Sequence, residues 1–245
     1  IDAVTKSGTN EFSGSAYYVY RDQDWVRDNA DGSPFNGFID EETYGGTFGG
    51  PIIKDTLFFF LNYEKFTRTA PGASFGPVGS GASNIVNITE AQIAEAQQIA
   101  RDVWGMDIGS FTIPEGLTTD VEEYALKLDW NINDSHRASL RYNKMEQSDA
   151  NMPGIGANSL SLNTYWYAHD KVFENVVGQL FSDWSQNFTT EFKVSQREYT
   201  AIRNPLGPRM PQIGISLREG PHPNDPDQPP GTPFLNFGTE QFSHI

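Results

Sequence analysis

The 245-residue sequence contains no cysteine, which excludes a disulfide framework, a thiolate nucleophile and a zinc site built on cysteine. Long hydrophobic runs are also missing, since no stretch approaches the roughly 20 apolar residues of a membrane-spanning helix. Hydrophobic residues reach 37%, below the usual share in globular proteins. Positive charge is scarce: 17 Lys and Arg face 32 Asp and Glu, giving a formal net charge of −15. This balance makes nucleic acid an unexpected partner.

Motifs of catalysis and metal binding are absent or incomplete. The four histidines are scattered, and none lies in a metal-binding frame. Residues 72–76 read GASFG, which matches the pattern of a nucleophile elbow, but the strand before it and the helix after it are missing. The acidic residues between positions 22 and 42 lack the spacing of a calcium loop. We therefore expect no catalytic residue, no metal site and no cofactor.

Aromatic residues, at 13%, gather in runs that are separated by alternately short and long connections. Three hairpins are predicted, at residues 43–53 with 56–67, 122–131 with 137–145, and 171–184 with 190–200. The connections between hairpins run to roughly 25–55 residues, far above the usual loop length. Short turns on one side and long loops on the other are typical of a transmembrane barrel. The predicted fold class is an all-β, antiparallel, up-and-down transmembrane β-barrel with long extracellular loops.

Alternation within the hairpins gives each predicted strand two different faces. In residues 122–131, the side expected to face lipid carries Tyr124, Leu126, Leu128 and Trp130, and the opposite side carries Glu123, Ala125, Lys127 and Asp129. In residues 56–67, Leu57 and Phe59 are assigned to the lipid face. Lys127, Asp129, Arg137 and Arg141 suit a wet lumen or a plug surface. One loop helix is predicted at residues 90–104, with a capping box of Thr89 and Gln92.

Three segments resemble TonB-dependent outer-membrane receptors, most closely the Oar-like, OmpA-related group. Residues 4–15, VTKSGTNEFSGS, resemble the junction between plug and barrel in that family. Residues 45–60, GGTFGGPIIKDTLFFF, resemble its first barrel hairpin. Residues 126–131, LKLDWN, with Arg137, Arg141 and Tyr142, resemble its second. Because the sequence starts in what reads as the middle of a strand, we expect it to be cut from a longer protein.

The resemblance implies a 22-stranded barrel in a Gram-negative outer membrane, filled by a plug and driven by the TonB–ExbB–ExbD complex. Residues 1–10 would be the last plug strand and junction, and residues 11–245 the N-terminal part of the barrel, with about seven strands. The junction residues would be Thr5, Lys6, Ser7, Gly8, Thr9 and Asn10. The partners would be this complex, through a region upstream of the sequence, together with outer-membrane lipid and an unknown extracellular ligand.

The acidic and aromatic loops supply candidates for ligand contact. They are Asp22, Asp24, Trp25, Tyr165, Trp166 and Tyr167, although the last three could equally form an outer aromatic girdle. Two alternatives stay open at this point. One is a soluble all-β binding module, such as a carbohydrate-binding sandwich, whose apolar faces would be covered by a second sheet. The other is a passive outer-membrane pore or adhesin barrel without energy coupling.

Overall fold

The structure is a computed structural model, and it describes residues 6–72, 74–113, 116–217 and 232–239. The chain divides into two compact units. Unit 1 comprises Ile1–Thr69, Thr118–Ser148 and Asp170–Ile202, and unit 2 comprises Ala70–Leu117, Asp149–His169 and Arg203–Ile245. Along the chain, unit 2 therefore consists of the long connections and the C-terminal segment, whereas unit 1 contains most of the strand residues.

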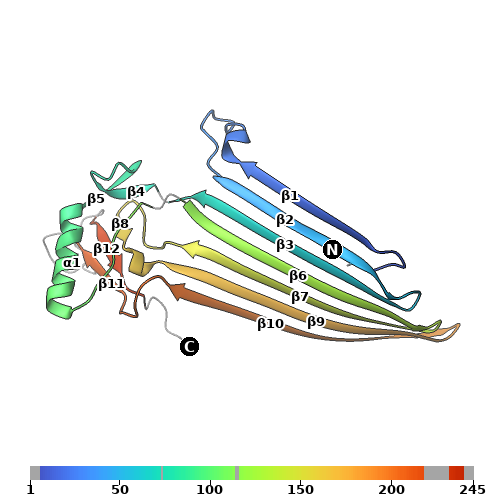
Figure 1. The fold of residues 1–245 in the computed structure, drawn as a ribbon. Helices are drawn as coiled ribbons and strands as arrows, with labels where there is room; N and C mark the ends of the chain where they lie inside the picture. Colours follow the sequence, from blue (N-terminus) through green and yellow to red (C-terminus); the bar gives the residue numbers. More distant parts are fainter. Residues whose placement is uncertain (1–5, 73, 114–115, 218–231, 240–245) are drawn as a thin grey trace. The chain divides into compact units, whose positions relative to one another are not determined.

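Unit 1 is built on a seven-stranded sheet in the order β1-β2-β3-β6-β7-β9-β10 (Figure 1). The strands are β1 (Ser13–Asp22), β2 (Asp40–Ile53), β3 (Leu57–Pro71), β6 (Gly116–Asn133), β7 (His136–Asn151), β9 (Tyr167–Ser185) and β10 (Phe188–Pro205). Each strand pairs with the next of these strands along the chain, so the sheet has an up-and-down order. The strand β2 pairs in antiparallel register with both β1 and β3. Within the described residues, β1 and β10 are the two edges of an open sheet.

All three predicted hairpins are confirmed, and each strand is longer than its aromatic run. The strand β6 extends over 18 residues and β9 over 19, whereas roughly 9–11 residues suffice to cross a membrane. The added residues are largely polar and continue the hydrogen-bonded ladder beyond the apolar segment. The hydrophobic pattern that marked the hairpins therefore ends before the strands do.

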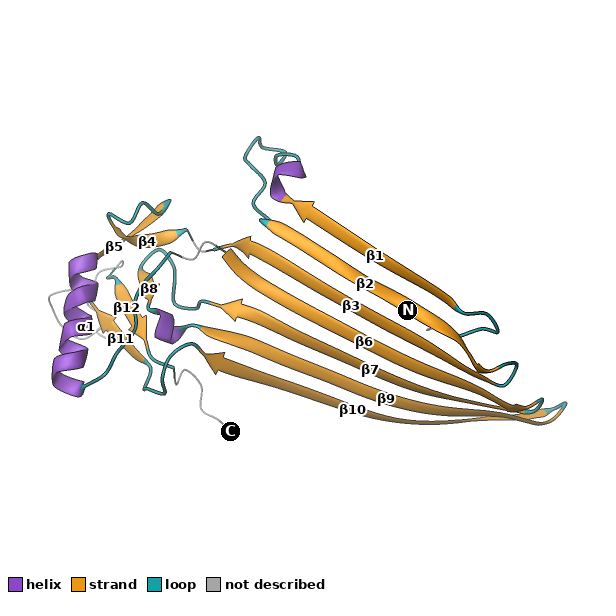
Figure 2. Cartoon of the chain, viewed as in Figure 1, coloured by secondary structure: helices purple, strands orange, loops and turns teal. Residues whose placement is uncertain are grey.

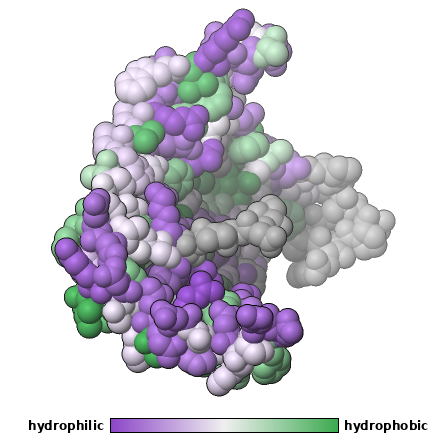
Figure 3. Space-filling model, turned by 90° about the vertical axis from the view of Figure 1, so that its right-hand side faces the viewer, coloured by the Kyte–Doolittle hydropathy of each residue, from purple (hydrophilic) through white to green (hydrophobic). Residues whose placement is uncertain are grey.

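The two faces of the sheet differ as the alternation predicted. Apolar side chains of the sheet are exposed in unit 1: Leu126, on the predicted lipid face, is 36% exposed, and Phe192 of β10 is 66% exposed. The seven strands form one layer, and no second sheet is stacked on them among the described residues of unit 1 (Figure 2). Seen from the short-turn end, the surface is largely hydrophilic with apolar patches among the polar groups (Figure 3). An exposed apolar face on a single-layer sheet contradicts the expectation for a soluble two-sheet sandwich.

Unit 2 has its own hydrophobic core. Its elements are the helix α1 (Glu90–Trp104) and five short strands, β4 (Phe75–Val78), β5 (Asn84–Thr89), β8 (Ser159–Ser161), β11 (Ile213–Ser216) and β12 (Phe234–Phe237). The core consists of Val86, Ile88, Ile93, Ala100, Ile108, Leu160, Leu162, Met210, Leu235 and Phe237. The predicted capping box is present, and Gly105 ends the helix with φ of 63°. The long connections and the C-terminal segment therefore share one hydrophobic core and do not form separate, independent loops.

Two local expectations need correction. Of the predicted N-terminal strand, residues 6–10 have no regular structure, and residues 1–5 lie outside the described ones. The C-terminal segment from position 204, where the density of proline predicts a loop, contains β11 and β12. Pro211 and Pro233 lie just before these strands, where proline costs no ladder hydrogen bond. No helix in the described ranges is long and apolar enough to span a membrane. The division of the chain at residue 10 stays a prediction.

Candidate functional site: the charged inner face and the first loop

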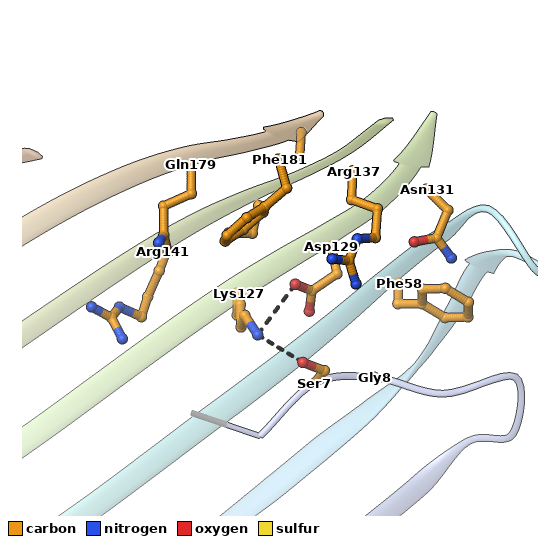
Figure 4. Close-up of a pocket in the computed structure, with 12 residues that line it drawn as sticks. Ser7, Gly8, Phe58, Lys127, Asp129, Asn131, Arg137, Arg141, Gln179 and Phe181 are labelled. Atoms are coloured by element: carbon orange, nitrogen blue, oxygen red, sulfur yellow. Dashed lines mark hydrogen bonds and ion pairs between the residues drawn. The ribbon is translucent and has the colours of Figure 1, made fainter. Parts of the chain in front are cut away.

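A cavity of about 580 Å³ lies on the charged face of the sheet in unit 1 (Figure 4). Its walls come from the turn-side ends of β3, β6, β7 and β9 and from the segment before β1. The lining side chains are Ser7, Gly8, Phe58, Lys127, Asp129, Asn131, Arg137, Ala138, Ser139, Arg141, Gln179 and Phe181. The charged residues that alternation assigned to one face are therefore brought together as predicted. We call this group the inner-face cluster.

The inner-face cluster is positively charged in an otherwise acidic protein. It holds three cationic side chains against the single carboxylate of Asp129. Lys127 Nζ lies 3.2 Å from Asp129 Oδ1, and Arg137 stacks over the Phe181 ring at 5.6 Å. The other Asp129 oxygen is buried without a hydrogen-bond partner in the described part of the chain. The cationic side chains of the cluster can thus bind anionic groups of a polypeptide placed against it, and Asp129 can accept a hydrogen bond from that polypeptide.

The segment before β1 already lies against this face. Lys127 Nζ donates to Ser7 Oγ at 2.7 Å. A methyl group on Gly8 would lie 2.3 Å from the Phe59 carbonyl oxygen, so only glycine fits this approach. A Cβ on Gly49 would lie 3.6 Å from Gly8 Cα, so the two backbones approach closely at this point. Of the predicted junction residues, 6–10 are described and Thr5 lies outside the described residues.

Three predicted ligand-contact residues gather at the start of the first long loop. Asp22 ends β1, and its Oδ1 accepts a hydrogen bond from the Asp24 backbone N–H at 2.9 Å, capping a short 3-10 turn, Gln23–Trp25. Trp25 is 71% exposed and packs edge-on against Tyr20 with ring centroids 5.5 Å apart. An exposed indole beside two carboxylates is available for ligand stacking. Their role in binding stays a prediction.

Sequence reasoning missed a four-residue cluster that fastens the same loop to the sheet. The Glu41 carboxylate forms two ion pairs. Its Oε2 lies 2.7 Å from Arg21 Nη1, and its Oε1 lies 3.6 Å from Arg68 Nε. Both guanidinium groups lie over the ring of Phe38, at 4.8 and 5.9 Å, and Arg68 also donates to the Gly37 carbonyl. We call Arg21, Phe38, Glu41 and Arg68 the loop clamp. Only the strand register, which puts Arg21 and Arg68 opposite Glu41, could have revealed it.

The other three predicted contacts, Tyr165, Trp166 and Tyr167, belong to unit 2 and differ among themselves. Trp166 is only 5% exposed, and its Nε1 donates to Ser161 Oγ at 2.8 Å, so its ring packs inside the unit instead of facing a ligand. Tyr165 accepts a hydrogen bond from Gln212 at 2.8 Å. Tyr167 lies under the Arg203 guanidinium at 5.7 Å. The role of Tyr165 and Tyr167 in ligand contact stays a prediction, whereas Trp166 has a packing role in this structure.

Two side chains in the loops have shifted pKa values. Hydrogen bonds from the Ser33 hydroxyl and backbone N–H lower the pKa of Asp31. Burial raises the pKa of Tyr165, with a smaller contribution from Tyr167. In the described ranges, no group of three or more acidic or histidine side chains could hold a metal ion. These shifts have local causes and do not mark an acid–base pair.

Comparisons with known proteins agree with this geometry. A family model described as an outer membrane beta barrel domain matches residues 4–85, from the junction through β1–β3 to the start of unit 2. The TonB-dependent transporter Oar of Myxococcus xanthus is 28% identical over 178 aligned residues, covering 66% of this chain. The match spans 15% of that relative's length. The comparison with solved structures gave no match.

Proposed function

Because the chain belongs to the TonB-dependent group of outer-membrane β-barrels, we propose that it is the N-terminal part of a barrel that imports an extracellular ligand. The chain belongs to the outer membrane of a Gram-negative bacterium. The proposed energy source is the inner-membrane proton gradient, delivered through a TonB–ExbB–ExbD complex that contacts a region upstream of this sequence. The proposed process is ligand capture by the loops, followed by displacement of a plug.

The observation that carries this proposal is the pairing of an exposed apolar face with a charged face that holds the N-terminal segment. On one side, the exposed apolar side chains of Leu126 and Phe192 can contact the hydrocarbon of the membrane. On the other side, a polypeptide already lies against Gly49 and Lys127. A barrel with a polypeptide inside it needs these two surfaces, whereas an open pore needs only a wet lumen.

The proposed ligand contacts are Asp22, Asp24 and Trp25 in the first loop, with Tyr165 and Tyr167 in unit 2. No bond is made or broken in this process, so we propose no enzymatic activity, cofactor or catalytic residue. Outer-membrane lipid is the proposed partner of the apolar face. Acidic and aromatic loops are compatible with siderophores, peptides, glycans and proteins as ligands.

Uptake by a gene-deletion strain tests the proposal. The strain is grown on defined nutrients and supplied with labelled siderophores, peptides and glycans, with and without a protonophore. We expect uptake of one class to disappear in the deletion strain and in protonophore-treated wild-type cells. A double variant, Asp24→Ala with Trp25→Ala, should reduce that uptake, whereas Asp28→Ala in the same loop serves as the control. Uptake that persists after the proton gradient collapses would identify a passive pore and refute energy coupling.

A further inference from the structure

The turn between β2 and β3 contains an unusual backbone conformation. Among the described residues other than glycine, Asp55 is the one with a positive φ, 62°. Asparagine and aspartate tolerate this left-handed region better than other residues, but glycine adopts it without strain. Residues held in such conformations are fixed by their surroundings, and here the surroundings include the segment before β1. A side chain at this position is therefore worth a structural explanation.

Asp55 and Asn10 hold each other through two hydrogen bonds. Asn10 Nδ2 donates to Asp55 Oδ1 at 2.5 Å, and the Asp55 backbone N–H donates to Asn10 Oδ1 at 2.7 Å. One of the two bonds has a carboxylate acceptor, which makes it stronger than a neutral bond. Glycine at position 55 would relieve the backbone strain of the positive φ, but it would lack the carboxylate that accepts the hydrogen bond from Asn10. The aspartate thus joins the turn to a residue 45 positions earlier.

The same turn is tied to the neighbouring hairpin. Asn131, near the end of β6, donates its side-chain amide to the Asp55 carbonyl at 3.1 Å. Its backbone N–H donates to the Thr56 carbonyl at 2.7 Å. Asn10 is therefore bonded to a turn that two hairpins hold in place. The partner of Asn10 is a rigid part of the sheet and not a loose loop.

Two further contacts precede Asn10 along the chain. Gly8 lies so close to the Phe59 and Gly50 carbonyls that a side chain would not fit. Ser7 Oγ accepts a hydrogen bond from the Lys127 ammonium group, which also forms an ion pair with Asp129. The contacts at Ser7, Gly8 and Asn10 thus span β2, β3 and β6 within four residues. By contrast, residues 6–12 have no regular secondary structure of their own to hold them.

We propose that residues 7–10 form a fixed anchor on the barrel wall, closed by the Asn10–Asp55 pair. The anchor rests on the proposed function in one respect, namely that a movable plug precedes residue 6. It sets the point at which any displacement of that plug stops, because residues 7–10 stay with the β2–β3 turn. The left-handed conformation of Asp55 is retained because the aspartate carboxylate completes the anchor.

Hydrogen exchange in the full-length protein tests the anchor. The protein, in detergent or in outer-membrane vesicles, is exposed to increasing urea, and peptides covering residues 7–12, the upstream segment and β2–β3 are followed by mass spectrometry. We expect residues 7–12 to lose protection together with β2–β3, at higher urea than the upstream segment. Exchange of residues 7–12 in step with the upstream segment would overturn the proposal.

Matched variants identify the groups responsible. Asn10→Ala and Asp55→Gly should each raise exchange of residues 7–12 by about tenfold or more, because each removes the charge-assisted bond. Asp55→Gly also relieves the turn, so a loss of protection in that variant is not caused by misfolding of β2–β3. Asp55→Asn keeps an acceptor oxygen and should largely restore protection, and Lys54→Ala in the same turn is the control.

Unchanged exchange in both Asn10→Ala and Asp55→Gly would refute the anchor. The measurement needs no transport, so failed uptake in the experiment above would overturn the proposed function and leave the exchange result to decide the anchor. Conversely, normal uptake with early release of residues 7–12 would overturn the anchor alone.

Discussion

At the scale of single residues, Glu41 links the sheet to the first loop. Its side chain is 11% exposed and has two arginine partners, whose own side chains are 57% and 41% exposed. Ion pairs between exposed groups contribute little, about 0–1 kcal/mol. Here the shared carboxylate also positions both guanidinium groups over Phe38, which is 3% exposed. The cluster therefore acts mainly by holding residues 37–39 in place.

Replacing Glu41 should release the loop without unfolding the sheet. We expect Glu41→Ala to increase tryptic cleavage after the exposed Arg27 by about threefold to tenfold, since a loss of about 1 kcal/mol changes an opening equilibrium roughly fivefold. Glu42→Ala is the matched control, because residue 42 points to the opposite face. Equal cleavage of the two variants would show that the loop clamp does not hold the loop.

The helix cap gives a second residue-scale prediction. The Gln92 backbone N–H donates to Thr89 Oγ1 at 3.2 Å, and the Thr89 backbone N–H donates to Gln92 Oε1 at 2.9 Å. We expect Thr89→Ala to destabilise α1 by about 1 kcal/mol, which corresponds to roughly fivefold faster amide exchange in its first turn. Thr89→Ser retains a hydroxyl and should exchange at a rate near the wild type. Similar exchange in all three proteins would contradict a stabilising role for the cap.

At the scale of elements, the outer face of β6 changes from apolar to polar along its length. On β6, apolar residues from Trp130 back to Leu126 give way to Tyr124 and then to Glu122, which pairs with Lys65 of β3 at 3.0 Å. Tyr63 and Tyr124 lie with ring centroids 5.2 Å apart between the two zones. Tyrosine is typical of a membrane interface. The membrane-spanning part of these strands therefore lies on the short-turn side of the tyrosines.

Adjacent positions on β6 test which face meets lipid. We expect Leu126→Arg to destabilise the full-length protein in lipid vesicles by about 2–4 kcal/mol, because the charge would lie in hydrocarbon. Ala125→Arg is the matched control on the inner face, beside Glu123 and Lys127, and should cost less than about 1 kcal/mol. The measurement is urea unfolding in vesicles. A larger loss for Ala125→Arg than for Leu126→Arg would reverse the assignment of the faces.

The whole molecule shows where sequence reasoning succeeded and where it stopped. The hairpins could be predicted because β pairing across a short turn is local and its alternation is visible in the sequence. The helix could be predicted because Thr89, Gln92 and Gly105 are local signals. The strands β8, β11 and β12 could not, because Leu160 and Leu235 become neighbours only through pairing over 75 positions. The anchor and the loop clamp were missed for the same reason.

Unit 2 should lose its stability as one body because its core joins two connections and the C-terminal segment. Leu160 is fully buried among residues that come from the other two of these segments. We expect Leu160→Ala to cost about 2–5 kcal/mol and to raise proteolysis throughout unit 2. Ile99→Ala, at a side chain that is 44% exposed, is the control and should cost about 1 kcal/mol or less. Proteolysis confined to residues 149–169 would show that the connections fold independently.

The open edges of the sheet determine how residues 1–245 behave when produced alone. Among the described residues, β1 and β10 are the edges of the open sheet, and no part of unit 1 covers the apolar face between them. In water both features promote association between chains, and in lipid an unpaired edge is not tolerated. We therefore expect residues 1–245 to aggregate in plain buffer and to remain dispersed only in detergent, as measured by size-exclusion chromatography with light scattering. The full-length protein in detergent is the control, because closing the barrel pairs both edges. A folded monomer of residues 1–245 in plain buffer would mean that the apolar face does not require lipid, and the barrel assignment would then fail together with the proposed transport.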